Sequence, residues 1–168
     1  MQVQFLFCIN KKPYAVLAWL IALATGRLMS HVAIGVIRGN KRVVYHAKYP
    51  ISVCQNMDDF YHDYHVSEIY EFYIDHEQTQ QEMIDWLDSK MGIKFSIKQL
   101  ILNAAELVSH RLAKLFGKSY WNGQKRLICV EFVARFLAMF FGVSWQESYD
   151  TINLNDGRKV IRKLKKLD

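Results

Sequence analysis

The chain has 168 residues, 51% of them hydrophobic and 23% charged, with three cysteines and a formal net charge of +6. This length and composition are typical of one globular domain that buries its own core. The odd number and wide spacing of the cysteines argue against a disulfide framework and against a Cys-ligated zinc site. We therefore expect a single domain over residues 1–168, in a reducing, cytoplasmic compartment, with no metal and no cofactor.

The charge is distributed unevenly along the chain. Residues 50–89 contain ten acidic side chains and no Lys or Arg. Six cations gather near the C-terminus: Arg158, Lys159, Arg162, Lys163, Lys165 and Lys166. We expect residues 156–168 to form a basic helix that begins after Asp156 and Gly157. Its cations either face solvent or make a weak contact with an anionic surface, which would be a membrane or a nucleic acid. The sequence indicates no obligate partner.

The N-terminal part of the chain predicts a strand followed by a helix. Residues Val3 to Ile9 are apolar and β-prone, and Pro13 suits the first turn of a helix that Gly26 ends. The apolar run from Ala15 to Thr25 is eleven residues long, which is too short to span a bilayer. We expect a buried helix here.

A hairpin and a further strand follow. His31 to Ile37 and Val43 to Ala47 are β-rich, and Gly39-Asn40 between them supplies a turn. Val66 to Ile74 is predicted to form another strand.

Helices dominate the second half of the chain. Three of them are indicated by reciprocal capping pairs: Thr79 with Glu82, Ser96 with Gln99, and Ser144 with Glu147. The second helix should end at Gly117, and a polar loop should cover residues Tyr120 to Arg126. The stretch Cys129 to Phe141 is almost entirely apolar and predicts a central buried helix. The whole pattern is that of an α+β domain.

Three residues that are distant in the sequence are candidates for one catalytic site. His31 opens the predicted hairpin, His46 closes it, and Cys129 enters the apolar helix. A helix N-terminus stabilises a thiolate and lowers the thiol pKa from about 8.5 to roughly 3.5–7.5. A thiol nucleophile also needs an imidazole base, whose second nitrogen is held by another polar group. Cys8 and Cys54, in contrast, are expected to be inert core cysteines.

The motifs around these residues resemble a known superfamily. The SHVAIGV and VVYHA segments of the hairpin, followed by CVEFV at the helix start, are similar to the circularly permuted papain-like proteins of NlpC type. This group includes YiiX-like proteins and the lecithin retinol acyltransferase group, in which the histidine strand precedes the cysteine helix. The resemblance implies a small antiparallel sheet packed against helices, with Cys129 as nucleophile, His31 as base and His46 as the residue that orients the base.

The function implied by this resemblance is cysteine-dependent hydrolysis of an amide, ester or thioester bond, with peptidase or amidase action favoured. One alternative is a lipid-directed thioesterase or acyltransferase of the same superfamily, which would need peripheral access to a membrane. A second alternative is a binding module without activity that uses the basic C-terminal helix.

Other residues could contribute to a site. Tyr120 and Trp121 precede the cysteine helix and are candidates for the wall of a substrate pocket. Glu131 either complements the helix dipole or shapes the site. The sequence His62-Asp63-Tyr64-His65 contains metal-binding residue types, but no Cys or further His recurs at ligand spacing, so we expect no metal there.

Overall fold

The computed structural model describes residues 1–11, 29–95, 126–145, 152 and 154–166. Three predicted segments lie wholly or largely outside this part of the chain: the helix beginning at Pro13, the helix beginning at Ser96, and the helix capped by Ser144. Tyr120 and Trp121 also lie outside it.

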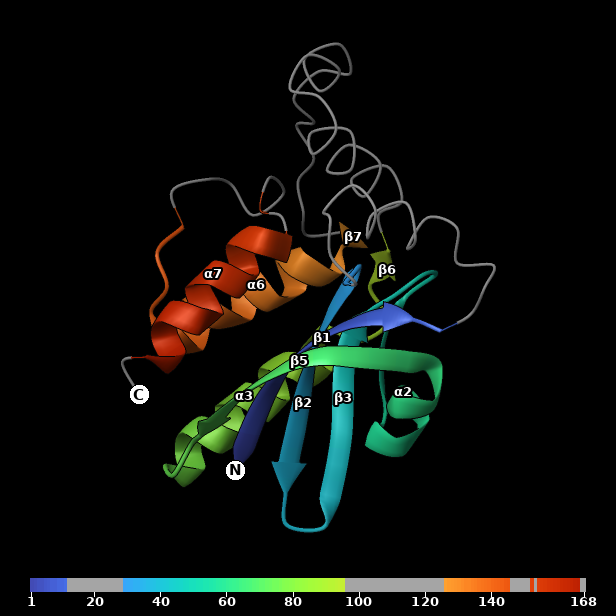
Figure 1. Ribbon diagram of the computed structural model, residues 1–168. Coiled ribbons are helices and arrows are strands. Elements are labelled where there is room, and N and C mark those ends of the chain that lie inside the picture. The colour runs from blue at the N-terminus through green and yellow to red at the C-terminus, as the bar shows by residue number, and fades with distance from the viewer. Residues whose placement is uncertain (12–28, 96–125, 146–151, 153, 167–168) are drawn as a thin grey trace.

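A five-stranded antiparallel sheet forms the centre of the fold, with strand order β4-β3-β2-β1-β5 (Figure 1). Its strands are β1 (Gln2–Asn10), β2 (His31–Arg38), β3 (Lys41–Ala47), β4 (Ser52–Asn56) and β5 (Tyr64–Tyr73). The predicted hairpin is confirmed as β2 and β3. Gly39 in its turn has φ of +58°, a backbone conformation that glycine adopts without steric cost. The predicted strands near Val3 and Val66 are confirmed as β1 and β5, whereas β4 was not expected.

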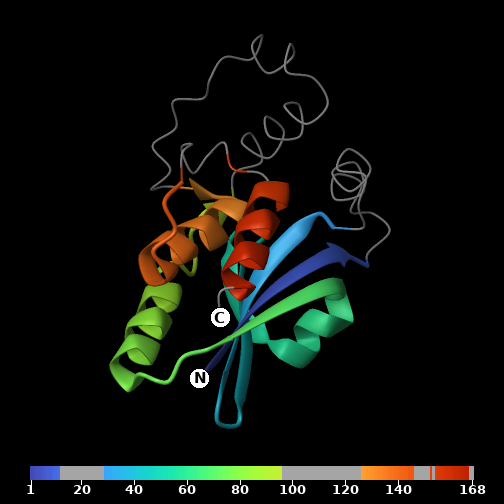
Figure 2. The same cartoon turned by 60° about the vertical axis from the view of Figure 1, so that its left-hand side comes forward.

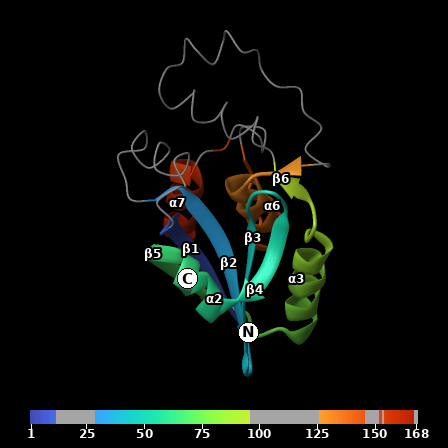
Figure 3. The same cartoon turned by 90° about the vertical axis from the view of Figure 1, so that its right-hand side faces the viewer.

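Helices cover both faces of this sheet. They are α2 (Met57–Asp63), α3 (Glu77–Ser89), α6 (Cys129–Phe141) and α7 (Leu154–Lys165). Seen from the side, α3 and α6 lie on one face and α2 lies on the other (Figures 2 and 3). Two short parallel strands, β6 (Lys94–Phe95) and β7 (Arg126–Leu127), precede α6. The described part of the chain is therefore an α+β structure.

The side chains of the strands alternate between two apolar cores. The larger core joins the sheet to α3, α6 and α7 and includes Phe5, Phe132 and Phe136. The smaller core lies under α2 and includes Leu6 and Phe60. Successive side chains of a strand point to opposite faces of the sheet, so neighbouring residues of β1 pack into different cores.

The predicted central helix is confirmed from Cys129 to Phe141 as α6. Gly142 ends it with φ of +63°, and the N–H of Gly142 bonds to the carbonyl of Leu137. The ring N–H of Trp145 donates to the carbonyl of Ala134 at 3.1 Å, which folds the following segment back onto the helix.

Two predicted helix starts are wrong. Helix α3 begins at Glu77 rather than at Thr79, because the carbonyl of His76 already accepts the N–H of Gln80. The basic helix α7 begins at Leu154 rather than after Gly157. Leu154 is buried and extends the apolar side of this helix by most of a turn.

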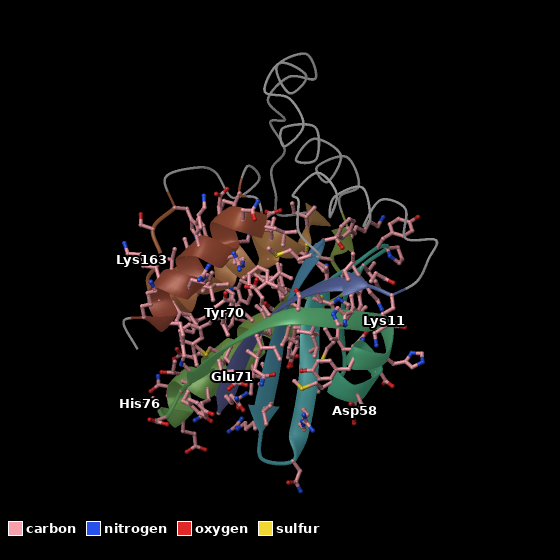
Figure 4. All side chains as sticks on the ribbon, in the orientation of Figure 1. Lys11, Asp58, Tyr70, Glu71, His76 and Lys163 are labelled. Atoms are coloured by element: carbon pink, nitrogen blue, oxygen red, sulfur yellow. The ribbon has the colours of Figure 1, made fainter. Side chains whose placement is uncertain are left out.

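Contacts with β5 hold α7 in place. The guanidinium of Arg158 donates to the Glu68 carboxylate, with an Nε–Oε2 distance of 2.6 Å, and Ile161 is fully buried. Arg158 therefore docks the helix instead of presenting its charge to a partner. We call the exposed remainder the tail cations: Lys159, Arg162, Lys163, Lys165 and Lys166. Among them, Lys163 points away from the sheet (Figure 4). None of the helices among the described residues has the length and apolar character needed to cross a bilayer.

Candidate active site

His31 and His46 form a direct hydrogen bond where strands β2 and β3 part. His31 is the first residue of β2, and its Nε2 lies 2.9 Å from Nδ1 of His46. The backbone ladder between these strands extends only as far as the pair Ile34 and Tyr45. The imidazole pair thus bridges the two strands beyond the end of their ladder, with both rings buried. The structure brings together the two histidines that the sequence singled out.

A hydrogen-bond chain continues from His46 to β4. His46 Nε2 lies 3.2 Å from Oε1 of Gln55, and Nζ of Lys48 lies 3.3 Å from the same oxygen. Gln55 reaches this position because its residue pairs with Val44 in the β3–β4 ladder. Both ring nitrogens of His46 consequently have a partner.

Two aromatic rings fix the positions of the imidazoles. Tyr64 stacks on His31 with ring centroids 5.2 Å apart and an interplanar angle of 23°. Phe60 stacks on Tyr64 at 4.6 Å, and both rings meet His46 edge-on at 5.2 and 5.6 Å. Such contacts restrict ring rotation and are worth about 0.5–1.5 kcal/mol each beyond their buried area.

Both imidazoles favour the neutral form. Burial lowers the pKa of His46 to about 4, and the nearby Lys48 charge acts in the same direction. The pKa of His31 is lowered well below its ordinary value by burial, by His46 and by Lys48. At neutral pH each ring therefore carries one proton and one lone pair, which is the state needed of a general base.

Cys129 occupies the first position of α6, as predicted. The preceding residue, Ile128, is extended and offers no side-chain cap, so the first N–H groups of the helix are available to other acceptors. The backbone N–H groups of Val32, Val130 and Cys129 itself lower the thiol pKa. Burial acts in the opposite direction and outweighs them, so the thiol pKa is raised.

The expectation of a lowered thiol pKa is thus wrong for this state of the protein. Cys129 is only 4% exposed, and the loss of hydration penalises the thiolate more than the helix N-terminus stabilises it. The resting pair is a neutral thiol and a neutral imidazole.

Cys129 and His31 meet at the same end of the sheet. The thiol lies beside the N–H of Val32, which directly follows His31 in β2, and α6 contacts both β2 and β3 (Figure 1). A negative charge on Cys129 would also raise the pKa of Cys8 and of Tyr64, the residue stacked on His31. Catalytic hydrogen bonds are often completed only when substrate is bound, and among the described contacts the thiol bonds to backbone N–H groups rather than to the His31 ring.

The other two cysteines differ from each other. Cys8 is buried on β1, opposite His31, and its thiol lies 3.8 Å from the His31 carbonyl oxygen. Cys54 is exposed, because it lies on β4 at the edge of the sheet. The prediction of a core position is therefore confirmed for Cys8 and wrong for Cys54.

Glu131 is held by its own helix. Its carboxylate is 1% exposed and accepts two hydrogen bonds from Arg135, at 3.0 Å from Nε and 2.7 Å from Nη2. This i,i+4 pair gives Glu131 a structural role close to Cys129. Tyr120 and Trp121, the predicted pocket residues, lie outside the described residues.

The sequence His62-Asp63-Tyr64-His65 spans the junction of α2 and β5. The His62 side chain is 88% exposed and lies 3.6 Å from Asp63. Among the residues that the structure describes, no three His, Cys, Asp or Glu side chains cluster as metal ligands would. The residue of this segment that matters to the site is Tyr64.

Sequence reasoning missed Gln55 and Tyr64. Gln55 belongs to a short strand of polar residues whose alternation is too brief to identify. Tyr64 drew attention only as part of the His62-Asp63-Tyr64-His65 sequence, which was considered for metal binding.

Comparison of the chain with known protein-family models finds no matching family, and comparison with curated proteins finds no match. The chemistry of the site is therefore the basis on which a function is assigned.

Proposed function

We propose that the protein is a cysteine hydrolase of the permuted papain-like type, which cleaves an amide, ester or thioester bond through an acyl-enzyme. The observation that carries the proposal is the buried hydrogen bond between His31 and His46, at the end of β2 where the Cys129 thiol also lies. A strand histidine, a second orienting residue and a helix-start cysteine form the set that acyl transfer to sulfur requires.

Acylation starts from the neutral pair. As the sulfur of Cys129 attacks the substrate carbonyl carbon, the thiol proton moves to Nδ1 of His31, and the carbonyl π electrons move to oxygen. The new imidazolium is stabilised by its Nε2–H bond to His46. When the tetrahedral intermediate collapses, the proton passes to the leaving amine, alcohol or thiol, and the bond to that group breaks.

Deacylation reverses the proton path. His31 takes a proton from water, whose oxygen attacks the thioester carbon, and the proton returns to sulfur as Cys129 leaves. The negative oxygen in both steps needs donors, and the backbone N–H groups at the start of α6, which has no side-chain cap, are the proposed source. Peptide or amide substrates are the first choice for this site.

Steady-state hydrolysis tests the proposal. Wild type, Cys129→Ser and His31→Ala are assayed against a panel of fluorogenic peptide amides, acyl esters and acyl thioesters. Cys54→Ser is the matched control, because this exposed thiol lies outside the site. We expect turnover of at least one class by wild type and Cys54→Ser, and its loss in the other two variants. Equal turnover in wild type and Cys129→Ser would overturn the assignment.

A further inference from the structure

A chain of hydrogen bonds leads from the half-buried ammonium group of Lys48 to the proposed base. It runs from Lys48 Nζ to Gln55 Oε1 at 3.3 Å, from the same oxygen to His46 Nε2 at 3.2 Å, and from His46 Nδ1 to His31 Nε2 at 2.9 Å. Each link restricts where the next group can carry its proton.

Lys48 determines which way the Gln55 amide faces. A lysine ammonium has three donors and no acceptor, so the Gln55 atom that meets it must be the carbonyl oxygen. The opposite orientation would place an NH₂ group against the ammonium. His46 Nε2 meets this same oxygen, and an oxygen of this kind only accepts. His46 must therefore carry its proton on Nε2.

The proton position on His46 then determines that on His31. Neutral His46 with its proton on Nε2 has a lone pair at Nδ1, which can accept a hydrogen bond. The group that lies against this lone pair is Nε2 of His31. His31 donates from Nε2, so its Nδ1 is free of a proton. A lone pair at Nδ1 is what a base facing a thiol needs.

We propose that Gln55, oriented by Lys48, is a positioning residue that sets the tautomers of His46 and His31 and leaves Nδ1 of His31 unprotonated. This inference rests on the proposed function for its catalytic consequence but not for the tautomers themselves. With no acceptor at position 55, His46 is free to move its proton to Nδ1 and donate to His31. His31 would then be protonated on Nδ1 and unable to accept the proton of Cys129.

Other groups around His46 do not fix its tautomer. Phe60 and Tyr64 contact it only through aromatic faces and edges. Asp63 of α2 acts on it through charge alone, raising its pKa. Among the described residues, Gln55 supplies the acceptor for its Nε2.

Long-range proton–nitrogen correlation NMR of ¹⁵N-histidine protein measures the tautomers directly at neutral pH. In wild type we expect the Nε2–H form at both His31 and His46. Gln55→Glu keeps an acceptor for His46 Nε2–H and should retain the wild-type tautomers. Gln55→Met is similar in size but has no such acceptor, and it should give a mixture of tautomers or the Nδ1–H form. Backbone spectra show which variants fold. The tautomers of the wild-type protein can be measured even if a variant does not fold.

Acylation of Cys129 by p-nitrophenyl acetate supplies the catalytic readout. We expect Gln55→Met to slow acylation about five- to tenfold, the worth of one hydrogen bond, and Gln55→Glu to rescue it. The inference is overturned if wild-type His31 carries its proton on Nδ1, or if Gln55→Met changes neither tautomers nor rate. If the tautomers are as stated but wild type is never acylated, the proposed function fails while the role of Gln55 in setting the tautomers stands.

Discussion

Acid should destabilise this protein through its buried histidines. His46 is completely buried, and its pKa of about 4 lies below the ordinary value of 6.5. The unfolded chain therefore binds more protons than the native state between these values. The stabilising contribution of neutral His46 is complete above the unfolded pKa and is lost as the pH falls towards the folded one.

The size of the effect follows from the same shift. For His46 alone, lowering the pH from about 8 to about 5 reduces the free energy of unfolding by about 2 kcal/mol. His31 acts in the same direction, because its pKa is also lowered. This loss is a large fraction of the total stability of a typical domain, about 5–15 kcal/mol.

Urea unfolding of wild type and His46→Asn across this pH range measures the effect. Asn does not titrate, and its amide oxygen can still accept the Nε2–H of His31. Carboxylate contributions, such as that of Glu68, are common to both proteins and cancel in the difference. Wild type should lose about 2 kcal/mol more than the variant, while the exposed control His62→Asn should behave as wild type. Parallel pH profiles for wild type and His46→Asn would show that the low pKa of His46 makes no contribution to the acid sensitivity of the fold.

Three further outcomes follow. His31→Ala should abolish acylation of Cys129, and His46→Ala should slow it less; equal losses would mean that the two roles are misassigned. Gly157→Ala should raise the free energy of unfolding in urea by about 0.5–1 kcal/mol, because the new Cβ meets Val130 at an ordinary 3.6 Å and alanine favours helix; a lower stability would show that α7 cannot accept it. Changing the tail cations to Gln should leave turnover unchanged but abolish any salt-sensitive binding to anionic vesicles, and a wild type that binds none at low salt excludes membrane attachment through the tail.

Sequence patterns predicted the long elements well. The apolar stretch from Cys129 to Phe141 and the hairpin at Gly39-Asn40 have strong periodicity and clear end signals, and the structure reproduces both. The elements between the hairpin and β5 were missed, because β4 is short and polar. Asn56 gave a usable signal, since its side chain accepts the N–H of Asp58 and caps α2.

The capping pattern at Thr79 failed for a different reason. A Thr and a Glu three residues apart also occur inside helices, and the N-cap of α3 is the extended residue His76, three residues before Thr79. Local residue types cannot distinguish these cases when the backbone before the helix is not known.

The candidate site was predictable only in part. His31, His46 and Cys129 stand in recognisable motifs, so their residue types and order were enough to select them. Gln55 was not, because its contact with His46 depends on the pairing of β4 with β3. The thiol pKa was predicted in the wrong direction because burial, which outweighs the helix N-terminus here, is a property of the packed core.

Locating the acyl group on the protein shows whether Cys129 is the nucleophile. The Cys54→Ser protein is mixed with p-nitrophenyl acetate and quenched in acid, and the modified peptide is identified by mass spectrometry. We expect one rapidly formed acetyl group on Cys129, with none at Cys8 and none at Cys129 in His31→Ala. Acetylation of Cys129 at the same rate with and without His31, or no acetylation of Cys129 in the folded protein, would show that Cys129 and His31 do not act as nucleophile and base.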